Sequence, residues 1–502
     1  MLKKNDLFEL VKSLSISEQR YLFSKSNVKN NDDNQYVMIV REMLNMEVYS
    51  EEDLKIKFAN YNFIKKTDVK KHFLFHWILR HLMEFHYRKH PVKNQLHEID
   101  ILIEKSLYQI AYRSIDPIKK QLKDSEDFLS LLSLLEKELA ISRFISINRS
   151  EEIVEELLYY SKAYSDFQTF KSLKYKFRKR LDQYVFVRTE DDLKKLKNII
   201  SNPIMDFDNP PVGIQNKFLY NLIYYWFYAS SNNWAEAYKY SQENFRLVTE
   251  IEYGNIDFTD EVVVAFYNLL TSSVVSGNDK SFNQVIFHLK KLIRETRSER
   301  IRLEAQFSLY LSQLIFANKK GKHERIHEII AEAEDFMTKN FTKFDKKRRN
   351  NFYFDLSKSY FIANDFQKPF HILKNIIENT GEKENSVDFI CFSKILYCLT
   401  CYERNDIELM IYSARSASYF LRENNSYFNF EKRILRFIRY ELPTIESLSH
   451  NQRSEKFVNL KEDFLKLFEN EYGKSVLTYF NFIKWTEDKI INPLPAASTK
   501  SF

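Results

Sequence analysis

The segment from Tyr224 to Leu247, YYWFYASSNNWAEAYKYSQENFRL, predicts two helices that fold back on each other. Asn232 stands at the predicted turn, with Tyr228 four residues before it and Trp234 two residues after it. A small residue, Ala237, follows at the fifth position, where it lets the two helices approach closely. The segment therefore predicts a helical hairpin whose second helix begins with an aromatic side chain.

The same pattern occurs three more times without gaps. The turn positions of these copies are Ser106, Asn364 and Asn405. Two looser copies, at Asn278 and Asn318, need insertions after the turn. None of the four ungapped copies has glycine at its turn. Asparagine tolerates the left-handed backbone conformation at modest cost, so it can supply the turn that glycine otherwise supplies.

This pattern resembles the tetratricopeptide repeat, whose turn glycine, following aromatic residue and packing alanine lie at the same offsets. The packing positions at 237, 285, 326, 369 and 410 are 41 to 48 residues apart. The repeat family has a period of about 34 residues, so the helices of this chain are expected to be longer. The resemblance implies an all-α fold, a right-handed α-solenoid of tetratricopeptide-like helix pairs, with a helical N-terminal region before it.

Over most of its length the chain also resembles an uncharacterised family of bacterial all-helical proteins. The segments that carry this resemblance are NDLFELVKSLS at 5–15, DVKKHFLFHWILRHL at 68–82, LYQIAYRSI at 107–115, DDLKKLKNIISNP at 191–203, YNLIYYWFYASSNNWAEAYKYS at 220–241 and YFNFIKWTEDKI at 479–490. The resemblance implies the helical fold and no particular activity.

Composition agrees with a chain of successive helices. Only 6 glycines and 9 prolines interrupt 502 residues, and aromatic residues make up 16%. Three cysteines are typical of a reducing compartment. The first fourteen residues lack the apolar run of a signal peptide, and the uncharged tract at 218–235 is shorter than a membrane span. We therefore expect a cytoplasmic protein without a membrane segment.

The clearest break in the chain is NPIMDFDNPPVG at 202–213, where two adjacent prolines and a glycine exclude helix. From it and from the repeat pattern we expect five regions. They are a helical N-terminal region with a basic helix at 1–97, a helical region with one repeat-like pair at 98–201, the repeat array at 214–442, C-terminal capping helices at 443–491 and a disordered tail at 492–502.

Charge is concentrated near the N-terminus. Between residues 64 and 93 eight basic and two acidic residues give a balance of +6, against +7 for the whole chain. Aromatic residues are interleaved with them, so this stretch could bind a polyanion or form a solvated ridge. The candidate polyanion-binding residues are Lys65, Lys66, Lys70, Lys71, Arg80, Arg88, Lys89 and Lys93.

No motif predicts catalysis, and we expect neither an enzyme nor a cofactor. Cys391, Cys398 and Cys401 fall near one apolar face of a predicted helix, which favours core packing over redox chemistry. His72 and His76 have a spacing that can share a metal ion, as do His86 and His90. Because each pair needs a third ligand from elsewhere, no metal site is predicted.

The favoured function is a protein-protein interaction scaffold that binds a protein or peptide in the concave groove of the array. Its alternative is a nucleic-acid-associated regulatory protein that uses the basic helix at 65–93. The groove would be lined by the first helix of each pair, expected at 215–231, 260–276, 304–318, 350–363 and 388–403. The first of these carries more aromatic residues than one buried face can hold. The candidate partner-binding residues are therefore Tyr220, Tyr224, Tyr225 and Tyr228.

Overall fold

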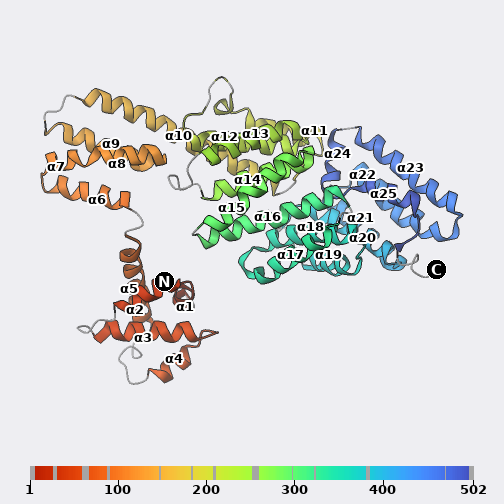
Figure 1. Ribbon diagram of the computed structural model, residues 1–502, viewed down its shortest axis with the longest axis horizontal. Coiled ribbons are helices and arrows are strands. Elements are labelled where there is room, and N and C mark those ends of the chain that lie inside the picture. Colours follow the sequence, from red (N-terminus) through yellow and green to blue (C-terminus); the bar gives the residue numbers. More distant parts are fainter. Residues whose placement is uncertain are drawn as a thin grey trace. The chain divides into compact units, whose positions relative to one another are not determined.

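The computed structural model (Figure 1) describes residues 6–25, 31–58, 67–87, 91–145, 149–182, 185–206, 208, 211–250, 259–296, 298–321, 324–379, 385–469 and 471–496. Every regular element in these ranges is a helix, and they contain no strand, which confirms the all-α fold class. No helix within the same ranges is both long and apolar enough to cross a membrane.

The helices form two compact units. The first comprises Met1–Lys123 and Leu129–Leu157, and the second comprises Asp124–Phe128 and Leu158–Phe502. The division therefore falls inside α10 (Ser150–Leu181).

Residues 202–213 interrupt the α-helices, as their prolines and glycine predict. The helix α11 (Glu190–Ile200) ends before them, they contain the 3-10 turn η2 (Pro203–Met205), and α12 (Ile214–Ser230) begins after them. Both flanking helices belong to the second unit. The segment is thus a connection within that unit.

Most helices of the first unit are short. They are α1 (Asp6–Lys12), α2 (Ile16–Ser24), α3 (Asn31–Asn45), α4 (Glu51–Lys57), α5 (Thr67–Tyr87), α6 (Pro91–Glu104), α7 (Tyr108–Arg113), α8 (Ile115–Ser125), α9 (Phe128–Ser142) and the start of α10. A capping box between Ser15 and Glu18 begins α2, and Ser50 caps α4. Apolar residues of α1 to α5 share one core.

The second unit contains five helix pairs and a C-terminal group of helices. The pairs are α12 with α13 (Trp234–Glu250), α14 (Thr259–Ser276) with α15 (Asp279–Glu295), α16 (Glu299–Lys320) with α17 (Ile326–Lys339), α18 (Lys346–Ile362) with α19 (Gln367–Asn379), and α20 (Val387–Glu403) with α21 (Ile407–Glu423). The turn η3 (Phe341–Lys343) precedes α18. The C-terminal group consists of α22 (Asn429–Arg436), the π-helix η4 (Phe437–Glu441), η5 (Leu442–Ser447), α23 (His450–Phe468), α24 (Glu471–Lys474), η6 (Ser475–Thr478) and α25 (Phe482–Ile491). Each pair contacts the next pair along the chain.

In each of the four ungapped copies of the pattern, a residue with a left-handed backbone conformation follows the first helix. These residues occupy the predicted turn positions. The φ angles are 59° at Asn232, 62° at Asn364 and 62° at Asn405, and Ser106 in the first unit has 58°. In the copy at Asn232, the N–H of the next residue donates to the carbonyl oxygen of Tyr228 at 2.8 Å. Equivalent bonds occur in the other three copies, and they satisfy the last carbonyl groups of each helix.

The two looser copies differ from the prediction. Gly277 and Gly321, with φ angles of 73° and 80°, take the left-handed conformation instead of Asn278 and Asn318. Asn278 caps α15 by accepting a hydrogen bond from the N–H of Ser281, while Asn318 lies within α16. Glycine takes this conformation readily because it has no Cβ; Gly277 directly precedes Asn278, whereas Gly321 follows Asn318 by three residues.

The C-terminal segment is held against α20. The Tyr402 hydroxyl donates to the carbonyl oxygen of Pro493 at 2.5 Å. The Glu403 carboxylate accepts hydrogen bonds from Lys489 Nζ at 2.6 Å and from the N–H of Ala496 at 3.2 Å. Residues 492–496 therefore have specific contacts, which differs from the disorder expected for the tail. The rest of the tail lies outside the described residues.

Candidate functional site

The four tyrosines predicted to face a groove are mostly buried. Tyr220, Tyr224 and Tyr225 are 8%, 5% and 5% exposed, and Tyr228 is half-buried. The Tyr224 hydroxyl donates to the carbonyl oxygen of Met205 in η2 at 2.7 Å. Apolar residues of α10, α11 and η2 pack around Tyr220 and Tyr224, whereas Tyr225 packs against residues of α13 to α16. The structure thus buries three of the four predicted partner-binding tyrosines.

The predicted polyanion-binding residues do not form one helix. The structure describes the side chains of Lys71, Arg80 and Lys93. Of the others, Lys70 has only its backbone described, and Lys65, Lys66, Arg88 and Lys89 lie outside the described residues. Lys71 Nζ lies 2.6 Å from Glu51 Oε2, and its side chain is 14% exposed, so its charge is engaged within the first unit. Arg80 is exposed on α5, whereas Lys93 is exposed on α6, because α5 ends at Tyr87.

The three cysteines pack in the core of the C-terminal helices, as predicted. Burial raises the pKa of all three thiols, that of Cys401 to about 12. They are therefore protonated at neutral pH.

The predicted histidine pairs have different surroundings. His72 and His76 lie together on α5, with their Nε2 atoms 3.2 Å apart. His86 contacts Glu18 Oε1 at 2.7 Å, and His90 lies outside the described residues. Over the ranges that the structure describes, no three histidine, cysteine or acidic side chains are grouped so that they could hold a metal ion.

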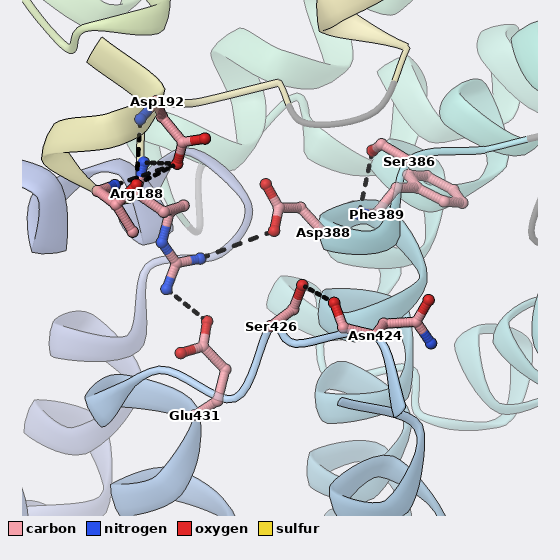
Figure 2. Close-up of polar contacts among 9 residues, drawn as sticks. Arg188, Asp192, Ser386, Asp388, Phe389, Asn424, Ser426 and Glu431 are labelled. Atoms are coloured by element: carbon pink, nitrogen blue, oxygen red, sulfur yellow. Dashed lines mark hydrogen bonds and ion pairs between the residues drawn. The ribbon is translucent and has the colours of Figure 1, made fainter. Parts of the chain in front are cut away.

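A buried ionic cluster joins three distant parts of the second unit (Figure 2). Arg188, in the connection between α10 and α11, places Nη2 at 2.6 Å from Oε1 of Glu431 on α22. Its Nη1 lies 3.9 Å from Oδ1 of Asp388 on α20. None of the three side chains is more than 4% exposed. We call these three residues the Arg188 junction.

Local contacts direct Arg188 toward its carboxylates. The N–H of Val187 donates to the carbonyl oxygen of Ser230 at 2.9 Å, at the end of α12. The N–H of Arg188 donates to Asp192 Oδ2 at 3.3 Å, at the start of α11 (Figure 2). The guanidinium lies 4.5 Å from the centre of the Phe428 ring, a distance typical of a cation–π contact. The backbone is thus fixed on both sides of the arginine.

Phe186 enters the core of the C-terminal helices. The rings of Phe186 and Tyr479 meet edge to face with centroids 5.6 Å apart, and Tyr479 stacks on Phe392 of α20 at 4.3 Å. Fifteen of the 17 residues of α20 are buried. This helix therefore has no open face for a partner, because the chain's own segments cover it.

The electrostatics of the junction favour one bound proton. Removal from water raises the pKa of Asp388 to about 7, although the Arg188 charge opposes the rise. The neighbouring Glu431 carboxylate adds to the rise. One guanidinium faces two carboxyl groups, and neither Asp388 Oδ2 nor Glu431 Oε2 has a hydrogen-bond partner among the described residues. A proton on Asp388 therefore makes the junction electrically neutral.

The Arg188 junction is better suited to holding chain segments together than to catalysis. Its three side chains are closed off from solvent, and the nearby Cys391 thiol has a raised pKa, so it is a poor nucleophile. Breaking one partner of such a buried pair leaves an uncompensated charge and is strongly destabilising. The junction can hold residues 185–189 in place and can exchange one proton.

An open groove between α15 and α16 is a second candidate, with a volume of about 400 Å³. Its lining consists of Phe287, Lys290, Ile293, Arg294, Gln306, Leu309 and Tyr310. The two cations lie one helical turn apart on α15, and both are exposed. No acidic residue is among those that line the groove. The site therefore combines apolar area with positive charge.

Neither the Arg188 junction nor the groove between α15 and α16 could be identified from the sequence alone. Arg188 directly follows the apolar residues Val185, Phe186 and Val187, and this cation at the end of an apolar run was the available signal. Its partners come from helices 200 or more positions later, which no local pattern indicates. For the groove, the signal was Phe287, a large apolar residue on the otherwise polar face of α15 that is 62% exposed.

Comparison of the chain with protein-family models and with curated proteins gave no match.

Proposed function

We propose that the protein is a non-enzymatic interaction scaffold, and that helices α12 to α21 form a right-handed solenoid that binds a protein or peptide. The observation that carries this proposal is the regular series of five helix pairs, in which each pair contacts the next. Such stacking gives extended surfaces that fit chain segments better than small metabolites. The left-handed turns at Asn232, Asn364 and Asn405 support the resemblance to tetratricopeptide repeats.

Burial decides which part of the array can receive a partner. The helix α20 is buried by Phe186, by Arg188 and by the C-terminal segment. The groove between α15 and α16 is open instead. The proposed binding surface therefore lies on the middle pairs of the array.

The alternative function, a nucleic-acid-associated regulator, rests on the exposed face of α5. Phe73 is 59% exposed there, and Arg80, about two helical turns later, is also exposed. Lys71 does not contribute, because its charge is paired with Glu51. Among the predicted cations whose side chains the structure describes, Arg80 and Lys93 are exposed and available to a phosphate backbone.

Cross-linking tests the proposal. The tagged full-length chain is captured from its native cells with and without nuclease, treated with a lysine-reactive cross-linker and analysed by mass spectrometry. We expect partner cross-links at lysines of residues 214–442 that persist after nuclease, with few in the first unit. Cross-links confined to the first unit, or loss of the partners after nuclease, would support the regulator and reject the scaffold.

A further inference from the structure

We propose that the groove between α15 and α16 is the binding site for an acidic peptide segment with one apolar anchor residue. The inference rests on the proposed scaffold function and specifies the chemistry of the partner. Three features of the groove carry it: its apolar floor, its two cations and its size.

The floor of the groove is apolar and incompletely covered. Leu309 is 7% exposed at its base, and Ile293 and Tyr310 are half-buried beside it. Phe287 stands at the edge with 62% of its surface exposed. Covering a large apolar side chain is favourable, because it removes apolar surface from water. An aliphatic or aromatic side chain of a partner that inserts here would gain much of this contact.

Two cations at the rim of the groove, Lys290 and Arg294, favour an acidic residue next to the apolar anchor of the peptide. Lys290 and Arg294 lie four residues apart on α15, so their side chains extend along the same face of the helix. The guanidinium can bind a carboxylate with two parallel hydrogen bonds, and the ammonium adds a flexible point charge. No carboxylate of the groove lining neutralises them. A glutamate or aspartate beside the anchor therefore matches the rim, whereas a basic partner is repelled.

The volume and the remaining polar group indicate a peptide. A volume of about 400 Å³ is at the lower end of the range for ligand pockets, enough for one or two side chains and too small for a folded domain. Gln306 also lines the groove, and its amide can both donate to and accept from a peptide backbone. Phosphate groups would use the same cations, but they would leave the apolar floor uncovered.

Peptide titration of the full-length chain tests the inference. The probe is a fluorescein-labelled acetyl-Glu-Glu-Phe-Glu-Glu amide, followed by fluorescence anisotropy. Peptides with alanine in place of phenylalanine, or lysine in place of glutamate, test the anchor and the charge. We expect the probe to bind more tightly than both, and its binding to weaken as salt is raised.

Surface variants locate the binding. The double substitution Lys290→Glu with Arg294→Glu should weaken binding of the probe by about tenfold or more, because it reverses both rim charges. Phe287→Ala should weaken it by about threefold or more. Lys291→Glu is the matched control, since this exposed lysine is next to Lys290 but does not line the groove, and it should change binding by less than about twofold.

The inference is overturned if the probe does not bind, if Lys291→Glu weakens binding as much as the double variant, or if a phosphopeptide or an oligonucleotide binds the groove more tightly. These outcomes would reject the acidic ligand without rejecting the proposal that the protein is a scaffold. A partner cross-linked to other pairs of the array would leave the scaffold in place and reject only the acidic ligand.

Discussion

Replacing Asp388 by asparagine should stabilise the second unit at alkaline pH. Asp388→Asn keeps the shape of the side chain and removes the charge that burial disfavours. One guanidinium then faces one carboxylate, Glu431, at 2.6 Å. The substitution therefore imitates the protonated form of Asp388 at every pH.

The size and sign of the effect follow from the two proton equilibria. The pKa of Asp388 is about 7 in the folded protein, against an ordinary value of 3.8. The unfolded chain releases this proton near pH 4 and the folded chain near pH 7, so the free energy of unfolding falls as pH rises between these values and is constant above them. About three pH units at about 1.4 kcal/mol each give roughly 4 kcal/mol. The substitution also removes a negative charge from the first turn of α20, which lowers the stability by about 0.5 kcal/mol. This loss is smaller than the gain, so Asp388→Asn remains stabilising at alkaline pH.

Hydrogen exchange measures this effect locally. Because the chain has two units, global denaturation does not give one free energy, whereas exchange at the N–H of Val187 reports the opening of residues 185–189. After correction for intrinsic exchange rates, the wild-type protein should open more readily at pH 8 than at pH 5, and Asp388→Asn should show little change. The control Asp191→Asn removes an exposed carboxylate of α11 and should keep the wild-type profile. An unchanged pH dependence in Asp388→Asn, or easier opening of that variant at pH 8, would refute the reasoning.

Three further predictions concern the fold and the basic surface. Ala237 is fully buried, so Ala237→Asp should lower the melting temperature followed by circular dichroism, because it buries an unpaired carboxylate, whereas the exposed Ala235→Asp should have little effect. Asn405→Val should destabilise by about 1–2 kcal/mol because its φ is left-handed, while Asn405→Gly should be nearly neutral; equal melts for the two variants would contradict the turn assignment. Arg80→Glu with Lys93→Glu should lower the salt concentration that elutes the protein from heparin, and unchanged elution would reject polyanion binding by this surface.

The turns could be predicted from the sequence because their conformation depends on neighbouring residues. At Asn232 and Asn405 the left-handed residue and its closing hydrogen bond involve only residues within one helical turn. The burial of Tyr220 could not be predicted in the same way. Residue spacing shows which face of a helix is apolar, but it does not show which segment covers that face. Here Phe170 of α10 covers Tyr220, with the centroids of the two rings 6.3 Å apart.

The candidate sites depend on contacts of a longer range. Arg188 is recognisable as a cation at the end of an apolar run, yet its pairing with Glu431 depends on how all the intervening helix pairs stack. The groove requires α15 and α16 to lie side by side, and only Phe287 indicated an unusual surface beforehand.

The sequence separation within the Arg188 junction also determines when it can form during synthesis. Glu431 follows Arg188 by 243 residues. At roughly 5–20 residues per second, the ribosome needs about 12–50 s to make that interval. During this interval Phe186 and Arg188 lack the helices that later bury them, although the early pairs of the array can already fold. The second unit therefore closes only after translation of α22, and the nascent chain exposes a site on which chaperones can act until then.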